Sequence, residues 1–464
     1  MRKITVIALV VLALLIQSGV NADYPSTYVA ADHDPFVIDQ VMIDRGLGQG
    51  AFRGWVKVEN GLIAAVERED VPRPKGIRQI NAEDQWLTPG IIDVHSHLGD
   101  YPSPSYRAHS DGNEATSPVT AEVWAEHSVW PQDPQFPLAL AGGVTTLQIL
   151  PGSANLFGGR SVVLKNVWAR TVQGMKFPGA PYGLKMACGE NPKRVYGSKS
   201  RSPSTRMGNF AGYRKAWIDA QEYQKKWRAY EKSLSDYEVW EAASDGQDYK
   251  TRPSPPKRDL KMETLVGVLD GEILVHNHCY RADEMAQIID LSREFGYQVT
   301  AFHHAVEAYK IGDLLAANKT CSAMWADWWQ FKLESFDGIK ENVAMVEAAG
   351  ACAIVHSDSA TGIQRLNQEA AKALAAGQRL GLAMSPSTAL TWITRNAAQA
   401  LGVLSRTGTI EVGKMADLVL WSAQPLSVYA RADSVFIDGV LQWDRKTGVG
   451  PVTDFELGQR EEIF

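Results

Sequence analysis

Residues 91–97 read IIDVHSH, an apolar run that ends in two histidines two positions apart. Similar short apolar runs recur along the chain and alternate with stretches of helical periodicity, such as 282–296 and 368–381. The other runs are GVTTLQIL (143–150), YGLKMACGE (182–190), EILVHNH (272–278), QVTAFHH (298–304), CSAMWAD (321–327) and CAIVHSD (352–358). Strands that alternate with helices indicate parallel βαβ units. About eight such strands predict a (β/α)8 TIM barrel over residues 89–403.

The two ends of the chain outside this barrel have a β-type pattern instead. The alternating runs are FVIDQVMI (36–43), GWVKVENGLIAAV (54–66), GTIEVGKMADLVLWSAQP (408–425) and SVFIDGVLQW (434–443). The first two predict a hairpin with a tight turn around Glu59-Asn60-Gly61. We expect residues 23–88 and 404–464 to build one small β-sandwich domain beside the barrel.

Residues 214–262 differ from the rest of the predicted barrel because they are crowded with Lys, Glu, Tyr and Trp. The segment ends in TRPSPPKRD (251–259), which breaks any helix. This composition predicts an exposed helical insertion followed by a loop. A solvated excursion, an active-site lid and a subunit contact all agree with it, so a homo-oligomer stays open.

The N-terminal residues predict where the protein is sent. Arg2 and Lys3 precede an apolar run over residues 4–16, and small residues follow up to Ala22. This pattern is typical of a secretory signal peptide over residues 1–22, cleaved after Ala22. The run is shorter than the roughly 20 residues of a membrane-spanning helix. We therefore expect a periplasmic or secreted protein with no stable membrane anchor after cleavage.

The charge balance excludes one class of partner. The chain has 47 Lys and Arg against 53 Asp and Glu, a formal net charge of −6 that becomes −8 once Arg2 and Lys3 are removed. A nucleic-acid-binding surface is normally basic. We therefore expect a small-molecule substrate and no nucleic acid.

The cysteines are expected to be free. Cys188, Cys279, Cys321 and Cys352 are too few and too scattered for a disulfide scaffold. Each lies in or beside an apolar run, where a free cysteine behaves as a small buried hydrophobe. An oxidising destination would also allow disulfides, but buried free thiols are the simpler prediction.

Side chains of the metal-ligand type end four of the predicted strands. They are His95 and His97, His276 and His278, His303 and His304, and Asp358. Positions i and i+2 of a strand point to the same face, and the C-terminal strand ends of a barrel carry its active site. Imidazoles with a carboxylate bind Zn, Mn, Fe or Ni. Structural histidines have no reason to gather at strand ends, so the pattern predicts a divalent-metal site.

A series of motifs carries a family resemblance. The motifs are TPGIIDVHSHLG (88–99), GGVTTLQILPGSANLFGG (142–159), GLKMACGENPKRVYG (183–197), HCYRADEM (278–285), HHAVEAYKI (303–311), IVHSDSA (354–360) and GTIEVGKMADLVLW (408–421). In this order the chain resembles the metal-dependent amidohydrolases, in particular the imidazolonepropionase-like and prolidase-like branch. The resemblance covers roughly residues 40–445 and says little about the substrate.

The resemblance implies a role for each matching residue. The implied metal ligands are His95, His97, His278, His304 and Asp358. Asp358 is also the implied general base. His276 and His303 would be neighbours of the ligands, although the residues alone leave the choice open within each histidine pair.

Lys185 and Glu190 compete for one further role. Two-metal members of this family bridge their ions with a carboxylated lysine or a glutamate from a middle strand. The two residues are five positions apart, so in a regular strand they would face opposite sides. We expect a bridged pair of divalent ions, most naturally zinc, without choosing between Lys185 and Glu190. A single ion follows if neither residue bridges.

Three residues near the strand ends are candidates for substrate binding. Tyr280 and Arg281 directly follow His278, where they are placed to hold a carbonyl or carboxylate group. Trp325 begins WADWWQFK (325–332) after the seventh predicted strand. It either forms an apolar wall for the substrate or packs the helices around the barrel.

The chemistry implied is hydrolysis of a C–N bond by a metal-activated hydroxide. A divalent ion lowers the pKa of its bound water from 15.7 toward about 7, and Asp358 can pass the proton to the departing nitrogen. The sequence has no G-x-S-x-G motif for a serine hydrolase. Dipeptides and N-acyl amino acids are the expected substrates. A cyclic amide hydrolase or deaminase is the alternative, and a non-catalytic binding module is the distant one.

Overall fold

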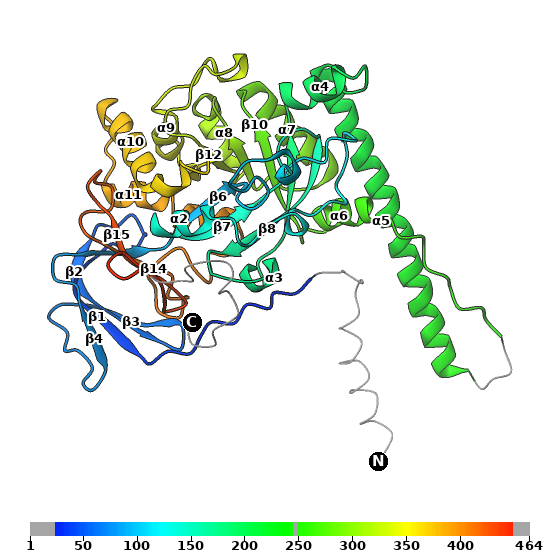
Figure 1. Cartoon of the computed structure of the whole chain (residues 1–464). Helices are drawn as coiled ribbons and strands as arrows, with labels where there is room; N and C mark the ends of the chain where they lie inside the picture. Colours follow the sequence, from blue (N-terminus) through cyan, green and yellow to red (C-terminus); the bar gives the residue numbers. More distant parts are fainter. Residues whose placement is uncertain (1–23, 245–248, 449–464) are drawn as a thin grey trace.

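The computed structural model describes residues 24–244 and 249–448. Figure 1 shows a barrel ringed by helices and a smaller β-rich part beside it. The predicted signal peptide, residues 1–22, lies outside the described residues. Within the described ranges, no helix combines the length and the apolar character that crossing a membrane requires.

An eight-stranded sheet forms the barrel, and its strands are hydrogen-bonded in chain order. They are β6 (Ile91–Ser96), β7 (Val144–Ile149), β8 (Phe157–Lys165), β9 (Gly183–Ala187), β10 (Leu274–Cys279), β11 (Ala301–His304), β12 (Cys321–Met324) and β13 (Ala353–Val355). The predicted TIM barrel is confirmed. It departs from a fully parallel barrel at β8, which pairs antiparallel with both β7 and β9.

Helices cover the outside of this barrel. They are α2 (Gln135–Ala141), α3 (Val172–Met175), α4 (Glu190–Gly197), α5 (Arg206–Ala243), α6 (Leu260–Leu269), α7 (Ala282–Phe295), α8 (Gly312–Ala317), α9 (Asn342–Ala348), α10 (Leu366–Arg379), α11 (Pro386–Thr391) and α12 (Arg395–Ala400). Helix α7 shows why these segments are helical. Met285, Ile288 and Ile289 form its buried stripe, and Gly296 ends it in a left-handed conformation at φ 78°.

The strands of the smaller domain come from both ends of the chain, as predicted. They are β1 (Phe36–Ile43), β2 (Phe52–Glu59), β3 (Leu62–Arg68), β4 (Arg78–Asn81), β5 (Trp86–Pro89), β14 (Leu418–Trp421), β15 (Ala432–Ile437) and β16 (Val440–Asp444). All eight are linked in one sheet, in which β5 joins the N-terminal strands to β14. The predicted hairpin is confirmed, since Asn60 and Gly61 connect β2 to β3 with φ 52° and 74°.

The long helix α5 extends away from the barrel (Figure 1). It contains the start of the segment 214–262, which we expected to be exposed. The first part of α5 packs on the barrel instead, because Trp217 is fully buried and its ring centroid lies 4.5 Å from that of Tyr297. Only the later turns of α5 are exposed along their length. The domain boundaries at 88/89 and 403/404 stay predictions.

The prediction of free thiols is wrong. The four cysteines form two disulfides, Cys188–Cys279 and Cys321–Cys352. In each pair one cysteine lies in a strand and the other lies directly beside the end of the neighbouring strand, with Cα atoms 5.2 Å and 4.4 Å apart. The partners are 91 and 31 positions apart in sequence, so their proximity depends on a strand register that spacing does not reveal.

Removal of one of these disulfides should measurably destabilise the protein. We expect the double variant Cys321→Ser/Cys352→Ser to lose about 2–4 kcal/mol of unfolding free energy, because the cross-link restricts the unfolded chain. Denaturant unfolding of the variant and the unsubstituted protein measures the difference. Alkylation of all four cysteines in the unfolded, unreduced protein would contradict the pairing.

A buried ion-pair network joins the barrel to the smaller domain. Lys165, the last residue of β8, is fully buried. Its Nζ lies 3.2 Å from Asp417 Oδ1 and 2.8 Å from Asp438 Oδ2. The hydroxyl of Tyr28 donates a 2.7 Å hydrogen bond to Asp438. Two buried carboxyl groups therefore depend on one ammonium group.

Replacing Lys165 by Met should cost about 3–5 kcal/mol of unfolding free energy, because it leaves buried carboxylates without a counter-charge. Urea unfolding measures the loss. Lys57→Met is the matched control, since Lys57 forms a partly exposed pair with Glu59 at 2.9 Å that should contribute about 0–1 kcal/mol. An equal effect of the two substitutions would show that the network does not stabilise the fold.

Candidate metal centre

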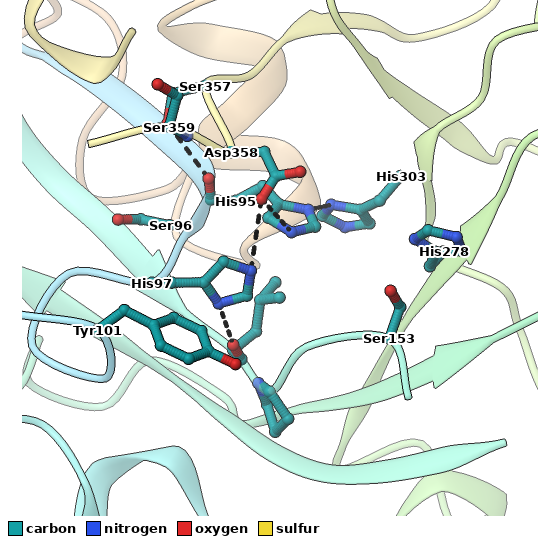
Figure 2. Close-up of polar contacts among 12 residues, drawn as sticks. His95, Ser96, His97, Tyr101, Ser153, His278, His303, Ser357, Asp358 and Ser359 are labelled. Atoms are coloured by element: carbon teal, nitrogen blue, oxygen red, sulfur yellow. Dashed lines mark hydrogen bonds and ion pairs between the residues drawn. The ribbon is translucent and has the colours of Figure 1, made fainter. Parts of the chain in front are cut away.

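Two histidines and a carboxylate converge where β6 meets the segment that follows β13 (Figure 2). Asp358 Oδ1 lies 3.5 Å from His95 Nε2 and 3.4 Å from His97 Nε2. The Nδ1 of His97 donates a 2.8 Å hydrogen bond to the carbonyl oxygen of Leu150. A proton on Nδ1 leaves the Nε2 lone pair directed at Asp358, which is the orientation that a metal-binding histidine requires.

His278 and His304 extend this cluster from β10 and β11. The ring centroid of His304 lies 4.7 Å from that of His95 and 4.5 Å from that of His278. His304 and Asp358 both have positive φ, 69° and 47°. Such a backbone costs about 1–3 kcal/mol for a residue with a side chain. The strain is therefore located at two positions that bring side chains into the cluster.

A chain of buried imidazoles continues inward from His95. Its Nδ1 lies 2.8 Å from His303 Nδ1, and His303 Nε2 lies 2.9 Å from His276 Nδ1. Each contact is a hydrogen bond in which one ring carries the proton. His303 and His276 are therefore engaged with other histidines, whereas His304 and His278 line the cavity described below.

Burial keeps this histidine cluster neutral. It lowers the pKa of four of the histidines, His95, His278, His303 and His304, well below the usual value. It also lowers the pKa of His276 to about 3 and that of His356 to about 4. Lys185 acts in the same direction on all of them when it is protonated. Neutral imidazole is the form that binds a metal ion.

Lys185 and Glu190 lie at different depths of the site. Lys185, on β9, is buried, and its Nζ donates a 2.9 Å hydrogen bond to the carbonyl oxygen of Pro151. Burial lowers the pKa of Lys185 to about 7. Glu190 begins α4, and its Oε1 lies 3.5 Å from Lys332 Nζ. The lysine is thus close to the histidines, and the glutamate is paired near the opening.

Asp93 holds the two segments of the cluster together. Its Oδ1 accepts hydrogen bonds from the backbone N–H groups of His95 (3.1 Å) and Ser357 (3.2 Å), and its Oδ2 accepts one from Ser357 Oγ. The backbone N–H of Asp358 donates to the carbonyl oxygen of His95 at 3.0 Å. The approach of Asp358 to His95 therefore has its own buried support.

The donor set fits a divalent metal ion. Two triads have ligand atoms within 4.8 Å of one another, His95, His97 and Asp358, and His95, His304 and His356. In the described part of the chain, several buried ring nitrogens have no hydrogen-bond partner, and those of His278, His304 and His356 are among them, as is Nε2 of His276. A buried polar atom without a partner is unfavourable. A bound ion would satisfy such atoms on its ligands, and neutral imidazoles with a carboxylate suit zinc.

The cluster lines a cavity of about 350 Å³. Tyr280 lines it too, and its ring centroid lies 4.8 Å from that of His278. Burial raises the pKa of Tyr280, so its hydroxyl keeps its proton. Trp325 stacks on His304 at 4.3 Å and lines a second cavity of about 260 Å³, which Trp328 also lines.

Arg281 is not part of this cavity. It is half-exposed, and its guanidinium donates two 2.9 Å hydrogen bonds to Asp283. Asp283 lies in the first turn of α7, just beyond Arg281 in the chain. The role that we predicted for Arg281 in substrate binding is therefore not supported by the geometry.

Other polar residues line the cavity without having been singled out from the sequence. They are Asn113, Ser153, Asn191, Arg194 and Lys332. Asn191, Arg194 and Lys332 belong to motifs already quoted, but the motifs alone do not show which side chains face the cavity. His356 precedes Asp358 by two positions, as His95 precedes His97, and that repeated spacing was an available signal.

Comparison with known proteins identifies the family of this chain. Residues 266–441 match the amidohydrolase family. An amidohydrolase of known structure from Thermotoga maritima MSB8 is 33% identical, has a TM-score of 0.76, and is matched over 88% of this chain and 100% of its own. The amidohydrolase tasK of Hapsidospora irregularis is 33% identical over 86% of this chain. This chain spans 41% of that relative's length.

A more distant relative matches the branch suggested by the motifs. An imidazolonepropionase from Mesorhizobium japonicum is 22% identical over 80% of this chain and 87% of its own length. The family resemblance seen in the sequence is confirmed by the match to the Thermotoga maritima protein, which is 33% identical and covers 88% of this chain. This chain belongs to the amidohydrolase family.

Proposed function

We propose that this protein hydrolyses a C–N bond of the amide or peptide type with the help of a divalent metal ion. The observation that carries the proposal is the convergence of His95, His97 and Asp358 within 4.8 Å beside the C-terminal end of β6. Enzymes with this barrel have their active sites at that face. Membership of the amidohydrolase family supports the same class of reaction.

The chain offers ligands for one or two ions. His95, His97 and Asp358 would hold the first, and His278 and His304 the second. When bound, such an ion supplies a water of lowered pKa and polarises the carbonyl group of the substrate. Nitrogen and oxygen donors of this kind favour zinc.

Lys185 is a better candidate than Glu190 for the group that would bridge two metal ions. A pKa of about 7 leaves a large share of Lys185 as the free amine at neutral pH, and the free amine is the form that can be carboxylated. Glu190 is held 3.5 Å from Lys332 instead. A one-ion site remains the alternative.

Two side chains of the cavity would act on the reacting groups. Asp358 would accept the proton of the attacking water and deliver it to the departing nitrogen. The hydroxyl of Tyr280 would donate a hydrogen bond to the carbonyl oxygen, since its raised pKa keeps it protonated. Trp325 and its cavity would receive a ring or an apolar side chain.

The size of the cavity suits small substrates such as dipeptides and N-acyl amino acids. Incubation of the zinc-loaded protein with these compounds and with cyclic amides, followed by separate assays for primary amine and for ammonia, tests the proposal. We expect a new primary amine, lost with a chelator and restored by zinc. Ammonia would favour a deaminase, and no product from any compound would contradict the proposal.

We also propose that the protein is exported. The two disulfides support the predicted signal peptide, because structural disulfides persist mainly in oxidising compartments. N-terminal sequencing of the protein recovered from the periplasm or medium should begin at Asp23. A cytoplasmic chain that keeps residues 1–22 would contradict this proposal.

A further inference from the structure

Two cations that are not candidate metal ligands line the same cavity as the histidine cluster. Lys332 belongs to the loop between β12 and β13, and Arg194 belongs to α4. The two side chains therefore reach the cavity from separate elements of the barrel. The reaction proposed above uses neither of them.

Lys332 is held in place by long contacts, and its nearest carboxylate, that of Glu190, is 3.5 Å away. Its Nζ lies 3.9 Å from the ring centroid of Tyr280, 3.3 Å from Asn191 Oδ1 and 3.5 Å from Glu190 Oε1. The side chain is only 16% exposed. An ammonium group has three donors, and every one of these polar contacts is 3.3 Å or longer. The group can therefore donate a shorter hydrogen bond to a ligand.

The nearby acids do not balance the two cations. Glu334 is bound by Arg206 and lies 4.0 Å from Lys332. Asp358 also lines the cavity but is assigned above to the metal site, so Glu190 is the remaining carboxylate opposite Lys332 and Arg194. Across the described ranges, the guanidinium of Arg194 forms no hydrogen bond or ion pair. One cationic group in this cavity is thus left for a ligand.

We propose that Lys332 and Arg194 bind a carboxylate group of the substrate. The enzyme would then act on amides that carry a free carboxylate close to the scissile bond. The inference rests on the proposed hydrolysis at the histidine cluster. A guanidinium group can bind a carboxylate through two parallel hydrogen bonds, and an ammonium group adds a point charge.

Tyr280 connects the two ends of this substrate site. Its ring lies under Lys332 Nζ, and its centroid is 4.8 Å from that of His278 and 5.3 Å from that of His304. A carboxylate bound at Lys332 would therefore be separated from His278 and His304 by about the width of the Tyr280 ring. That separation suits the carboxylate and the amide bond of a single amino-acid residue. The cavity beside Trp325 would take the side chain of that residue.

A matched pair of ligands tests the inference by binding. N-acetyl-L-phenylalanine has the carboxylate, and N-acetyl-L-phenylalaninamide lacks it. Calorimetric titration into zinc-loaded Asp358→Asn protein should show the acid binding at least about tenfold more tightly. Adding Lys332→Met or Arg194→Gln should remove most of that preference, and Lys332→Arg should retain part of it. Lys193→Gln, a neighbouring cation that does not line the cavity, is the control and should retain all of it.

Equal binding of the two compounds, binding of neither, or a preference that survives both substitutions would overturn the inference. Hydrolysis assays on the unsubstituted enzyme separate this from failure of the proposed function. Hydrolysis of both compounds without a preference would defeat the inference alone. A clear binding preference without hydrolysis of any amide would defeat the proposed function alone. Circular dichroism of each variant checks that it is folded.

Discussion

The Asp358→Asn variant is expected to lose about 10³-fold in kcat, with a much smaller change in KM. Asn has almost the same shape as Asp but cannot accept the proton of the attacking water, and general acid–base groups of this kind contribute about 10²–10⁴-fold. KM should change little because Lys332, Arg194 and Tyr280 still line the cavity. Steady-state kinetics on zinc-saturated protein measures both parameters.

The position of Asp358 between two candidate metal ligands explains why we expect a large loss of kcat in the Asp358→Asn variant. It contacts both His95 and His97 at about 3.5 Å, so the substitution also weakens metal binding. Metal content must therefore be measured on the same sample. Asp290→Asn, a change on the exposed face of α7, is the matched control and should have normal kinetics. A kcat within threefold of normal for metal-loaded Asp358→Asn would remove Asp358 from the reaction.

The His97→Ala variant is expected to lose tight metal binding. His97 presents Nε2 toward Asp358 because its Nδ1 is bound to the carbonyl of Leu150. Loss of a hydrogen-bond partner behind a ligand already costs about 10–100-fold in metal affinity, so loss of the ligand itself should cost more. Titration of the metal-loaded protein against a competing chelator measures the change in affinity.

The control for this variant is His127→Ala, because the His127 side chain is 53% exposed and lies outside the cavity of the cluster. We expect it to have unchanged metal content and activity. Full retention of metal and rate by His97→Ala would instead assign the site to other ligands, with His304 and His356 the next to test.

Much of the site could be predicted from the sequence because its residues end short apolar runs. The spacing of His95 and His97, and its recurrence at His276 and His278, places each pair on one face of a strand. The roles within each pair could not be read in this way. His303 and His304 are consecutive, and their different surroundings depend on the positive φ of His304 and on the hydrogen bond between His303 and His95.

The parts that the sequence did not reveal depend on contacts between distant segments. The disulfide Cys188–Cys279 requires the register of β9 against β10, which places the two cysteines side by side across 91 residues. Arg281 does not line the cavity, whereas Lys332, which comes from a loop two strands away, does. Arg281 donates hydrogen bonds to Asp283, two positions further on. The position of Arg281 in the motif does not reveal this pairing.

The most direct test is elemental mass spectrometry of the purified protein. Hydrolysis of dipeptides and N-acyl amino acids is assayed on the same preparation. The account predicts one to two zinc or similar ions per chain and an activity that follows metal content through chelation and reconstitution. About two ions would support Lys185 as the bridging group, and about one would favour the single-ion alternative. A chain that binds no ion after growth with added zinc or manganese would contradict the account.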